Sequence, residues 1–261
     1  MRIVVLTSGV RGIASRVLPA LCNNRNIDVV KLVVAHGLSP DRKRNLRRKC
    51  RKAIKIGFLG ALNGIRMRDW YADKDADDIH MVCRDFNVGL SETPFINCET
   101  TEEAFRQANA DLGLSLGNGY IPKSVFSIPK FGMVNIHTEI LPDFQGAQSI
   151  IWPIYEGRKE TGFTIHQISN KIDKGVILFQ KRYPIQFCST LRETVEMNLK
   201  TARMNIPEAF SYVCQNYTSL AGESISQEDR RSYTTPSIWQ FFRMARNHRK
   251  MYKESLTERS S

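Results

Sequence analysis

The 261-residue sequence lacks the features that identify several common classes of protein. No apolar run approaches the roughly 20 residues of a membrane-spanning helix, and Ile3–Leu6 is too short for the core of a signal peptide. The six cysteines form no CxxC pair, so we expect free thiols in a reducing, cytoplasmic compartment. No HExxH, CxxC or paired acidic set indicates a metal site, and no GxxxxGK(S/T) motif indicates a phosphate-binding loop for ATP hydrolysis.

Acidic residues are scarce beside basic ones, and the formal net charge is +12. Much of the excess lies in residues 42–55, which read RKRNLRRKCRKAIK. One interpretation is a solvated helix face. The other is contact with phosphate or an anionic membrane, since apolar residues such as Leu46 and Ile54 would make an amphipathic interfacial helix. No aromatic residue interleaves with the charges, so nucleic acid is not favoured as a partner.

Short apolar runs alternate with helical patterns along the chain. We predict strands over 2–7, 29–35, 111–116 and 133–136, a short strand over Ile79–Cys83, and a hairpin formed by 163–168 and 176–185. Helices are predicted from Thr190 to about Asn216 and over 238–251, with a frayed polar tail beyond. The pattern indicates an α/β fold with a Rossmann-like, mostly parallel sheet, and a main domain of residues 1–189 with a basic insertion at about 38–78. Residues 190–261 are expected to form a small helical extension.

Asn135 and His137 are two residues apart in a predicted strand, which puts both side chains on one face. An amide beside an imidazole can polarise a carbonyl and stabilise an oxyanion. The carboxylate of Asp173 could set the charge of the imidazole and take a proton, so the three side chains predict acyl transfer to an amine. Each also has a structural interpretation: a turn residue for Asn135, a core histidine for His137 and a turn cap with Gly175 for Asp173.

Ligand sites in such sheets lie beyond the carboxyl ends of strands, where Gly9, Gly117–Gly119 and Asn135–His137 are expected. The Ser8–Gly12 turn lacks a full GxGxxG motif. Its backbone N–H groups could still hold a phosphate, with an ordinary strand-to-helix turn as the alternative. His166 lies in a strand pattern and is assigned no role.

Three segments follow the order and spacing of a known family. They are Asn135-Ile136-His137 with Leu141-Pro142 and Gly146, then 160–165 (ETGFTI), then Asp173-Lys174-Gly175. The chain resembles the formyltransferases that use 10-formyltetrahydrofolate, over roughly residues 1–6 and 110–200. The resemblance implies that His137 stabilises the tetrahedral oxyanion and that Asn135 orients the formyl oxygen. It implies that Asp173 pairs with His137 and accepts or relays the proton of the amine.

The same resemblance implies where the folate lies. The pterin is expected against the Gly117–Ile121 loop and the Ile168–Asp173 segment, with no metal. The implied cofactor-binding residues are Asn118, Gly119, Tyr120, Ile121, Ile168 and Ile172.

The family includes enzymes that act on initiator methionyl-tRNA, on glycinamide ribonucleotide and on nucleotide-linked amino sugars. Residues 146–153 (GAQSIIWP) are most similar to the sugar enzymes, so we expect a nucleotide-activated 4-amino-4,6-dideoxy sugar used for surface polysaccharide or O-antigen. Gly9, Arg11 and Gln148 are the candidate substrate-binding residues. The other two acceptors, formate release to water, and a non-catalytic basic module that binds RNA or a membrane remain alternatives. The C-terminal helices favour a homodimer.

Overall fold

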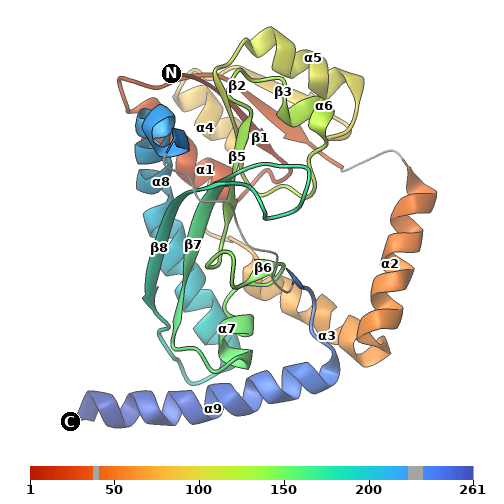
Figure 1. Ribbon diagram of the computed structural model, residues 1–261, viewed down its shortest axis with the longest axis vertical. Helices are drawn as coiled ribbons and strands as arrows, with labels where there is room; N and C mark the ends of the chain where they lie inside the picture. Colours follow the sequence, from red (N-terminus) through yellow and green to blue (C-terminus); the bar gives the residue numbers. More distant parts are fainter. Residues whose placement is uncertain (38–40, 223–231, 261) are drawn as a thin grey trace.

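The computed structural model describes residues 1–37, 41–222 and 232–260. The main strands are β1 (Arg2–Thr7), β2 (Asp28–Ala35), β3 (Leu90–Thr93), β4 (Leu112–Ser115), β5 (Met133–His137), β7 (Glu160–Gln167) and β8 (Ile177–Pro184). They form one seven-stranded sheet in the order β3-β2-β1-β4-β5-β7-β8 (Figure 1). Neighbours from β3 to β5 are parallel, whereas β7 is antiparallel to β5 and β8. The predicted α/β fold with a mostly parallel, Rossmann-like sheet is confirmed.

Helices cover both faces of the sheet, which is why its parallel strands are short continuous apolar runs. One face carries α1 (Ile13–Cys22), α4 (Ile79–Asp85) and α8 (Leu191–Gly222), and the other carries α5 (Glu99–Ala108) and α6 (Lys123–Phe126). Every residue of β1 from Ile3 to Thr7 is buried, as is all of β4. The central strands therefore lie in a dry interior and end beside the site described below.

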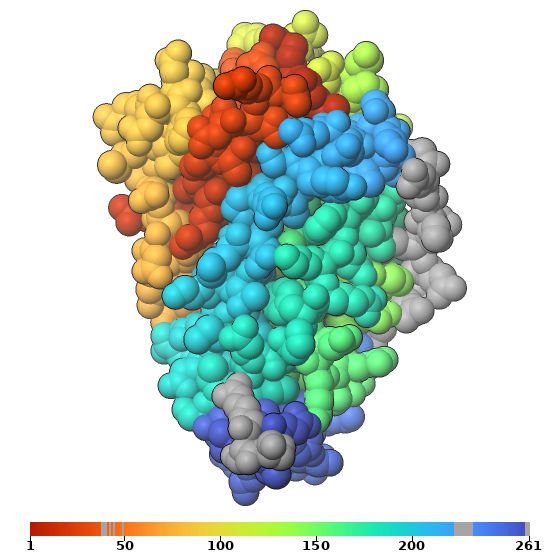
Figure 2. Space-filling model, turned by 90° about the vertical axis from the view of Figure 1, so that its left-hand side faces the viewer, coloured from red at the N-terminus to blue at the C-terminus, as the bar shows by residue number. Residues whose placement is uncertain are grey.

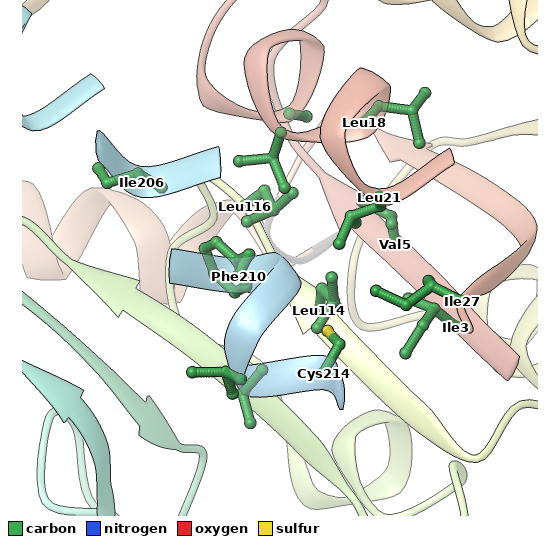
Figure 3. Close-up of a cluster of buried hydrophobic side chains, with 14 of the residues drawn as sticks. Ile3, Val5, Leu18, Leu21, Ile27, Leu114, Leu116, Ile206, Phe210 and Cys214 are labelled. Carbon is green, nitrogen blue, oxygen red and sulfur yellow. The ribbon is translucent and has the colours of Figure 1, made fainter. Parts of the chain in front are cut away.

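Helix α8 belongs to the main hydrophobic core. Figure 2 shows it running obliquely across one face of the molecule beside α1. Phe210 and Cys214 of α8 lie near Leu114 of β4, with Leu21 of α1 in the same cluster (Figure 3). The division of the chain at residue 189 stays a prediction, and the packing shows that α8 shares the core of the sheet.

A reciprocal pair of hydrogen bonds fixes the start of α8. The backbone N–H of Glu193 donates to Thr190 Oγ1 at 3.1 Å, and the backbone N–H of Thr190 donates to Glu193 Oε2 at 3.2 Å. This capping box satisfies two N–H groups that a helix start leaves without partners. It explains why the helix begins where the sequence predicted.

A second apolar cluster is separate from the main core of the sheet and involves the helices that remain. The remaining helices are α2 (Arg42–Ile56), α3 (Phe58–Met67), the 3-10 turn η1 (Arg68–Tyr71), α7 (Ile151–Tyr155) and α9 (Ile238–Ser260). Trp70, Phe144, Trp152 and Met244 are members of this cluster, in which α9 packs against α7. Within the described ranges, no helix is both long and apolar enough to cross a membrane.

A buried ion network ties the segment after η1 to both α1 and α8. Arg16 donates from Nε and Nη2 to the two carboxylate oxygens of Asp73 at 2.6 and 2.8 Å. Arg203 Nε lies 3.5 Å from Asp73 Oδ2, and the Asp73 side chain is only 7% exposed. A bidentate carboxylate between two guanidinium groups is a strong and directional contact.

Two local predictions were wrong. Residues 79–83 form the start of helix α4 rather than a strand, because the Asp78 side chain accepts a hydrogen bond from the backbone N–H of His80 and caps a helix. The strand of this region is β3, which the sequence did not predict. The polar tail from Glu254 continues α9 to Ser260 instead of fraying. Residues 38–40 of the predicted insertion, and 223–231 and 261 of the predicted extension, lie outside the described residues.

Candidate active site

The carboxyl end of β5 brings Asn135 and His137 to a cavity of about 470 Å³. Asn135 lies opposite His166 in the antiparallel register with β7, and His137 lies opposite Thr164. The connection between β7 and β8 brings Asp173 to the same cavity. The three residues predicted to be catalytic therefore meet in one place, although Asp173 is 36 positions after His137 (173 − 137).

His137 is held between two oxygen acceptors. Its Nε2 lies 2.7 Å from the carbonyl oxygen of Phe144, and its Nδ1 lies 3.8 Å from Asp173 Oδ2. The side chain is 12% exposed. Each ring nitrogen of His137 thus faces an oxygen, one at hydrogen-bond distance and one farther away.

Asp173 is fixed by the loop that follows β5. Its Oδ2 accepts a hydrogen bond from the backbone N–H of Gly146 at 2.9 Å, and its own backbone has a positive φ of 53°. The carboxylate thus reaches beyond its own turn to the loop after β5. This hydrogen bond joins the β7–β8 connection to Gly146 of β6 (Gln145–Gly146).

His166 is a site residue that the sequence did not single out for a role. Its Nδ1 lies 2.9 Å from the carbonyl oxygen of Gln167, and its Nε2 lies 3.4 Å from Asn135 Nδ2 and 3.7 Å from Asp173 Oδ1. Burial lowers the pKa of His166, which favours the neutral ring. Nδ1 then carries the hydrogen, so Nε2 accepts one from the Asn135 amide. The amide nitrogen has a second hydrogen that is available to a ligand.

Two glycines permit the close backbone contacts around Asp173. A Cβ on Gly175 would lie 1.6 Å from the carbonyl oxygen of Gln167, and one on Gly146 would lie 2.1 Å from that of Tyr233. Gly146 also has a φ of 106°, a conformation that side chains disfavour. Packing therefore requires a glycine at position 175 of the Asp-Lys-Gly sequence.

The buried carboxyl group of Glu139 supports the loop between β5 and α7. Glu139 Oε1 accepts hydrogen bonds from the backbone N–H of Ile150 at 2.6 Å and from Thr161 Oγ1 at 2.9 Å, and its Oε2 accepts one from the backbone N–H of Ile140. Burial raises the pKa of Glu139 to about 7, against the effect of these donors. Glu139 positions the loop that presents Gly146 to Asp173.

All six residues predicted to contact the folate line the same cavity: Asn118, Gly119, Tyr120, Ile121, Ile168 and Ile172. Tyr120 is 49% exposed and Ile172 is 64% exposed. Large apolar side chains exposed at a cavity offer a surface to a flat ring. Their contact with folate remains a prediction.

Asn118 joins the ends of two strands beside the cavity. Its Nδ2 donates to the carbonyl oxygen of Leu6 at 2.7 Å and to Ser115 Oγ at 3.1 Å, while its Oδ1 accepts from Ser8 Oγ at 2.9 Å. Its polar atoms thus hold the wall together. A side-chain role toward a ligand is secondary to this structural one.

The three predicted substrate-binding residues are not among those that line the cavity. Gly9 N and Thr7 Oγ1 are 3.2 Å apart, and Arg11 forms an isolated backbone bridge with Asp78. Gln148 has a φ of 68°, and its buried Oε1 has no hydrogen-bond partner among the described residues. Their role toward a substrate stays a prediction.

The segment Ser232–Thr234 also lines the cavity, although no sequence pattern predicted it as part of the site. It reaches the site because β6 (Gln145–Gly146) pairs in parallel with β9 (Ser232–Tyr233). Tyr233 packs against Trp152, with ring centres 4.7 Å apart, and against Phe144 at 5.6 Å. The C-terminal part of the chain thus completes the wall beside Gly146.

No group of three or more His, Cys, Asp or Glu side chains placed to hold a metal occurs in the part of the chain that the structure describes. The side chains that meet around Asn135 are an amide, two imidazoles and a carboxylate.

Comparison with known proteins agrees with this geometry. Residues 1–209 match the family model described as formyl transferase. The methionyl-tRNA formyltransferase of Ehrlichia canis (strain Jake) is 33% identical over 108 residues, which are 41% of this chain and 36% of that protein, so the chain matches only about a third of its length.

Two solved structures share the fold. The phosphoribosylglycinamide formyltransferase of Anaplasma phagocytophilum has a TM-score of 0.58 and 15% identity, covering 83% of this chain and 87% of that one. The N-formyltransferase of Helicobacter canadensis, in complex with folinic acid and dTDP-3-aminofucose, has a TM-score of 0.55 and 18% identity, covering 92% of this chain and 71% of that one. Since the family model matches most of its length, the chain belongs to the formyl transferase family.

Proposed function

We propose that the chain transfers a formyl group from 10-formyltetrahydrofolate to the amine of a nucleotide-activated amino sugar, such as a 4-amino-4,6-dideoxy sugar. One observation carries the proposal. Asn135, His137 and Asp173 share a single cavity with all six residues of the expected folate slot. Side chains suited to acyl transfer thus lie beside the residues expected to bind the acyl donor.

The lining of the cavity fits the folate. Ile121, Ile168 and Ile172 provide apolar wall, Tyr120 provides an exposed aromatic ring, and the exposed Lys171 also lines the cavity and can meet a carboxylate. Pockets for small ligands combine such apolar walls with a few polar groups. When bound, 10-formyltetrahydrofolate would supply an activated formyl group.

The amide and the imidazole suit an electrostatic role. The second N–H of the Asn135 amide can donate to the formyl oxygen and orient it. The imidazolium of His137 can stabilise the negative charge that develops on that oxygen. His166 holds the Asn135 amide in place through the 3.4 Å contact between Nε2 and Nδ2.

Asp173 completes the proton balance. A bond forms between the acceptor nitrogen and the formyl carbon, and the bond from that carbon to N10 of the donor breaks. The acceptor nitrogen loses a proton, which Asp173 accepts directly or through His137, 3.8 Å away, and N10 gains a proton as it leaves. The hydrogen bond from Gly146 holds the carboxylate in position for this step.

The choice of an amino sugar has two supports. Residues 146–153 resemble the corresponding segment of the sugar enzymes, and the side chain of Gln148 within them has an oxygen without a hydrogen-bond partner among the described residues. A ligand N–H or O–H could satisfy this buried Oε1. The Helicobacter canadensis neighbour was solved with a dTDP-linked amino sugar, and at 18% identity its likeness to this chain is one of fold. Methionyl-tRNA and glycinamide ribonucleotide are the alternatives, because the relatives in sequence and in fold bear those names.

The test incubates the protein with 10-formyltetrahydrofolate and a panel of amino-sugar nucleotides, methionyl-tRNA and glycinamide ribonucleotide. Mass spectrometry then records the gain of one formyl group on each acceptor. We expect gain on an amino-sugar nucleotide. Gain on methionyl-tRNA or glycinamide ribonucleotide alone would reject the sugar, and formate release with no amine added would indicate hydrolysis.

We also propose that the chain works in the cytoplasm as a homodimer. Sedimentation velocity on the purified protein would measure the oligomer directly, and a monomer at micromolar concentration would reject the dimer. A non-catalytic binding module predicts that His137→Ala leaves function intact while charge reversal in residues 42–55 abolishes it. The proposed enzyme predicts instead that His137→Ala abolishes formyl transfer, while charge reversal in residues 42–55 leaves it intact.

A further inference from the structure

Helix α2 projects from the body of the molecule toward α3 (Figure 1). Apart from the half-buried Asn45 and the buried Ile56, every side chain of α2 that the structure describes is exposed. Its sequence contains nine Lys or Arg residues and no Asp or Glu. A helix with this composition contributes little to the core, so its exposed surface needs another explanation.

The exposed surface of α2 has two sides. Leu46, Cys50, Ala53 and Ile54 follow the spacing of one helix face. Leu46 is 62% exposed and Ile54 is 81% exposed. The cations around the rest of the helix include Arg47, Arg48, Arg51, Lys52 and Lys55. The helix is amphipathic, with its apolar stripe in water.

Helix α3 continues the apolar surface. Its exposed large side chains are Phe58, Leu59, Leu62 and Ile65, and Phe58 is 76% exposed. The inner side of α3 is fixed to the body at two glycines: a Cβ on Gly60 would lie 3.1 Å from Ser237 Cα, and one on Gly64 would lie 2.6 Å from Thr235 Cγ2. The outer side is thus held rigidly with its apolar residues exposed. Such a concentration of exposed apolar residues marks an interaction surface.

We propose that α2 and α3, together called the basic arm (residues 42–67), dock the protein on an anionic membrane surface. The apolar stripe would enter the boundary between headgroups and acyl chains, while the cations contact lipid phosphates. A second copy of the chain would bring two dense positive charges together. Nucleic acid would engage the cations and leave the stripe in water, whereas an anionic bilayer accommodates both.

Vesicle co-sedimentation tests the proposal with the full chain. We expect wild-type protein to sediment with mixed phosphatidylglycerol and phosphatidylcholine vesicles and to remain in solution with phosphatidylcholine alone. The double reversal Arg47→Glu with Arg51→Glu should weaken the partition by more than about tenfold, because it replaces two cations that attract anionic lipid with two anions that repel it. Its matched control, Arg25→Glu with Arg84→Glu, changes the same charge at exposed positions outside the arm and should bind as wild type.

The apolar part of the proposal has its own variant. Leu46→Ser with Ile54→Ser keeps every charge and should also lower the partition by about tenfold or more, since buried apolar surface is lost. All four substituted side chains of α2 are exposed, so circular dichroism should show an intact fold. The proposal is wrong if the wild type ignores anionic vesicles, if this serine pair binds as tightly as the wild type, or if single-stranded RNA is bound in place of vesicles.

Discussion

Replacing Asp173 with Asn separates the charge of this carboxylate from its structural role. In the structure, Asp173 Oδ2 accepts the hydrogen bond of Gly146 N at 2.9 Å and lies 3.8 Å from His137 Nδ1. An asparagine oxygen can still accept from Gly146, so the loop keeps its support. The negative charge that pairs with His137 and takes the proton is lost.

The expected magnitudes differ for catalysis and for folding. A positioned acid or base contributes about 100- to 10,000-fold to a rate, which corresponds to about 3–5 kcal/mol in the activation free energy. The free energy of unfolding should fall by no more than about 2 kcal/mol, because desolvation offsets much of the attraction in a buried ion pair and the asparagine keeps the hydrogen bond from Gly146. Catalysis should therefore suffer far more than stability.

Single-turnover formyl transfer and urea unfolding measure the two effects on the same preparations. The matched control is Asp85→Asn, an exposed carboxylate in α4 outside the site, which should change neither value. A rate within about threefold of wild type for the Asp173 variant, with normal folding, would refute the assigned role.

Three further predictions concern stability and loop support. Asp73→Ala removes the carboxylate shared by two guanidinium groups, one of which belongs to the half-buried Arg203. In urea titrations its free energy of unfolding should fall by about 3–5 kcal/mol. The control Asp85→Ala should show little change. Because the pKa of Glu139 is raised from 4.5 to about 7, the native state binds the proton more tightly, and this group's contribution to stability is complete below pH 4.5 and is lost as pH rises to 7. The difference in unfolding free energy between wild type and Glu139→Gln should thus shift by about 3 kcal/mol across that range, and a constant difference would contradict the raised pKa. Gly175→Ala should reduce single-turnover formyl transfer at least about tenfold, since the added Cβ would meet a backbone oxygen and displace the carboxylate of Asp173. A fully active variant would show that the turn can adjust.

The central sheet could be predicted because its strands are covered on both faces and so read as apolar runs. The edge strand β3 could not, since its four residues, Leu90–Thr93, include the exposed Glu92 and only one buried side chain. The neighbouring segment Ile79–Cys83 has a similar apolar content, and only the side chain of Asp78 decides in favour of a helix. Short segments of this kind carry too little periodicity to separate the two structures.

The site could be predicted where its residues share one strand or one motif. Asn135 and His137 follow from strand spacing, and Asp173 from its motif. His166 joins them only through the register between β5 and β7, and Ser232–Thr234 only through the short pairing of β6 with β9. Such contacts between distant segments depend on tertiary pairing, which no local pattern records.

The most direct test of the account is formyl transfer from 10-formyltetrahydrofolate to an amino-sugar nucleotide, measured by mass spectrometry for wild type and for His137→Ala. His137 has its ring nitrogens 2.7 Å from Phe144 O and 3.8 Å from Asp173, so it is the centre of the proposed set. We expect one added formyl group with wild type and a rate at least about 100-fold lower with the alanine variant. Equal rates for the two proteins, or no transfer to any amine by the wild type, would contradict it.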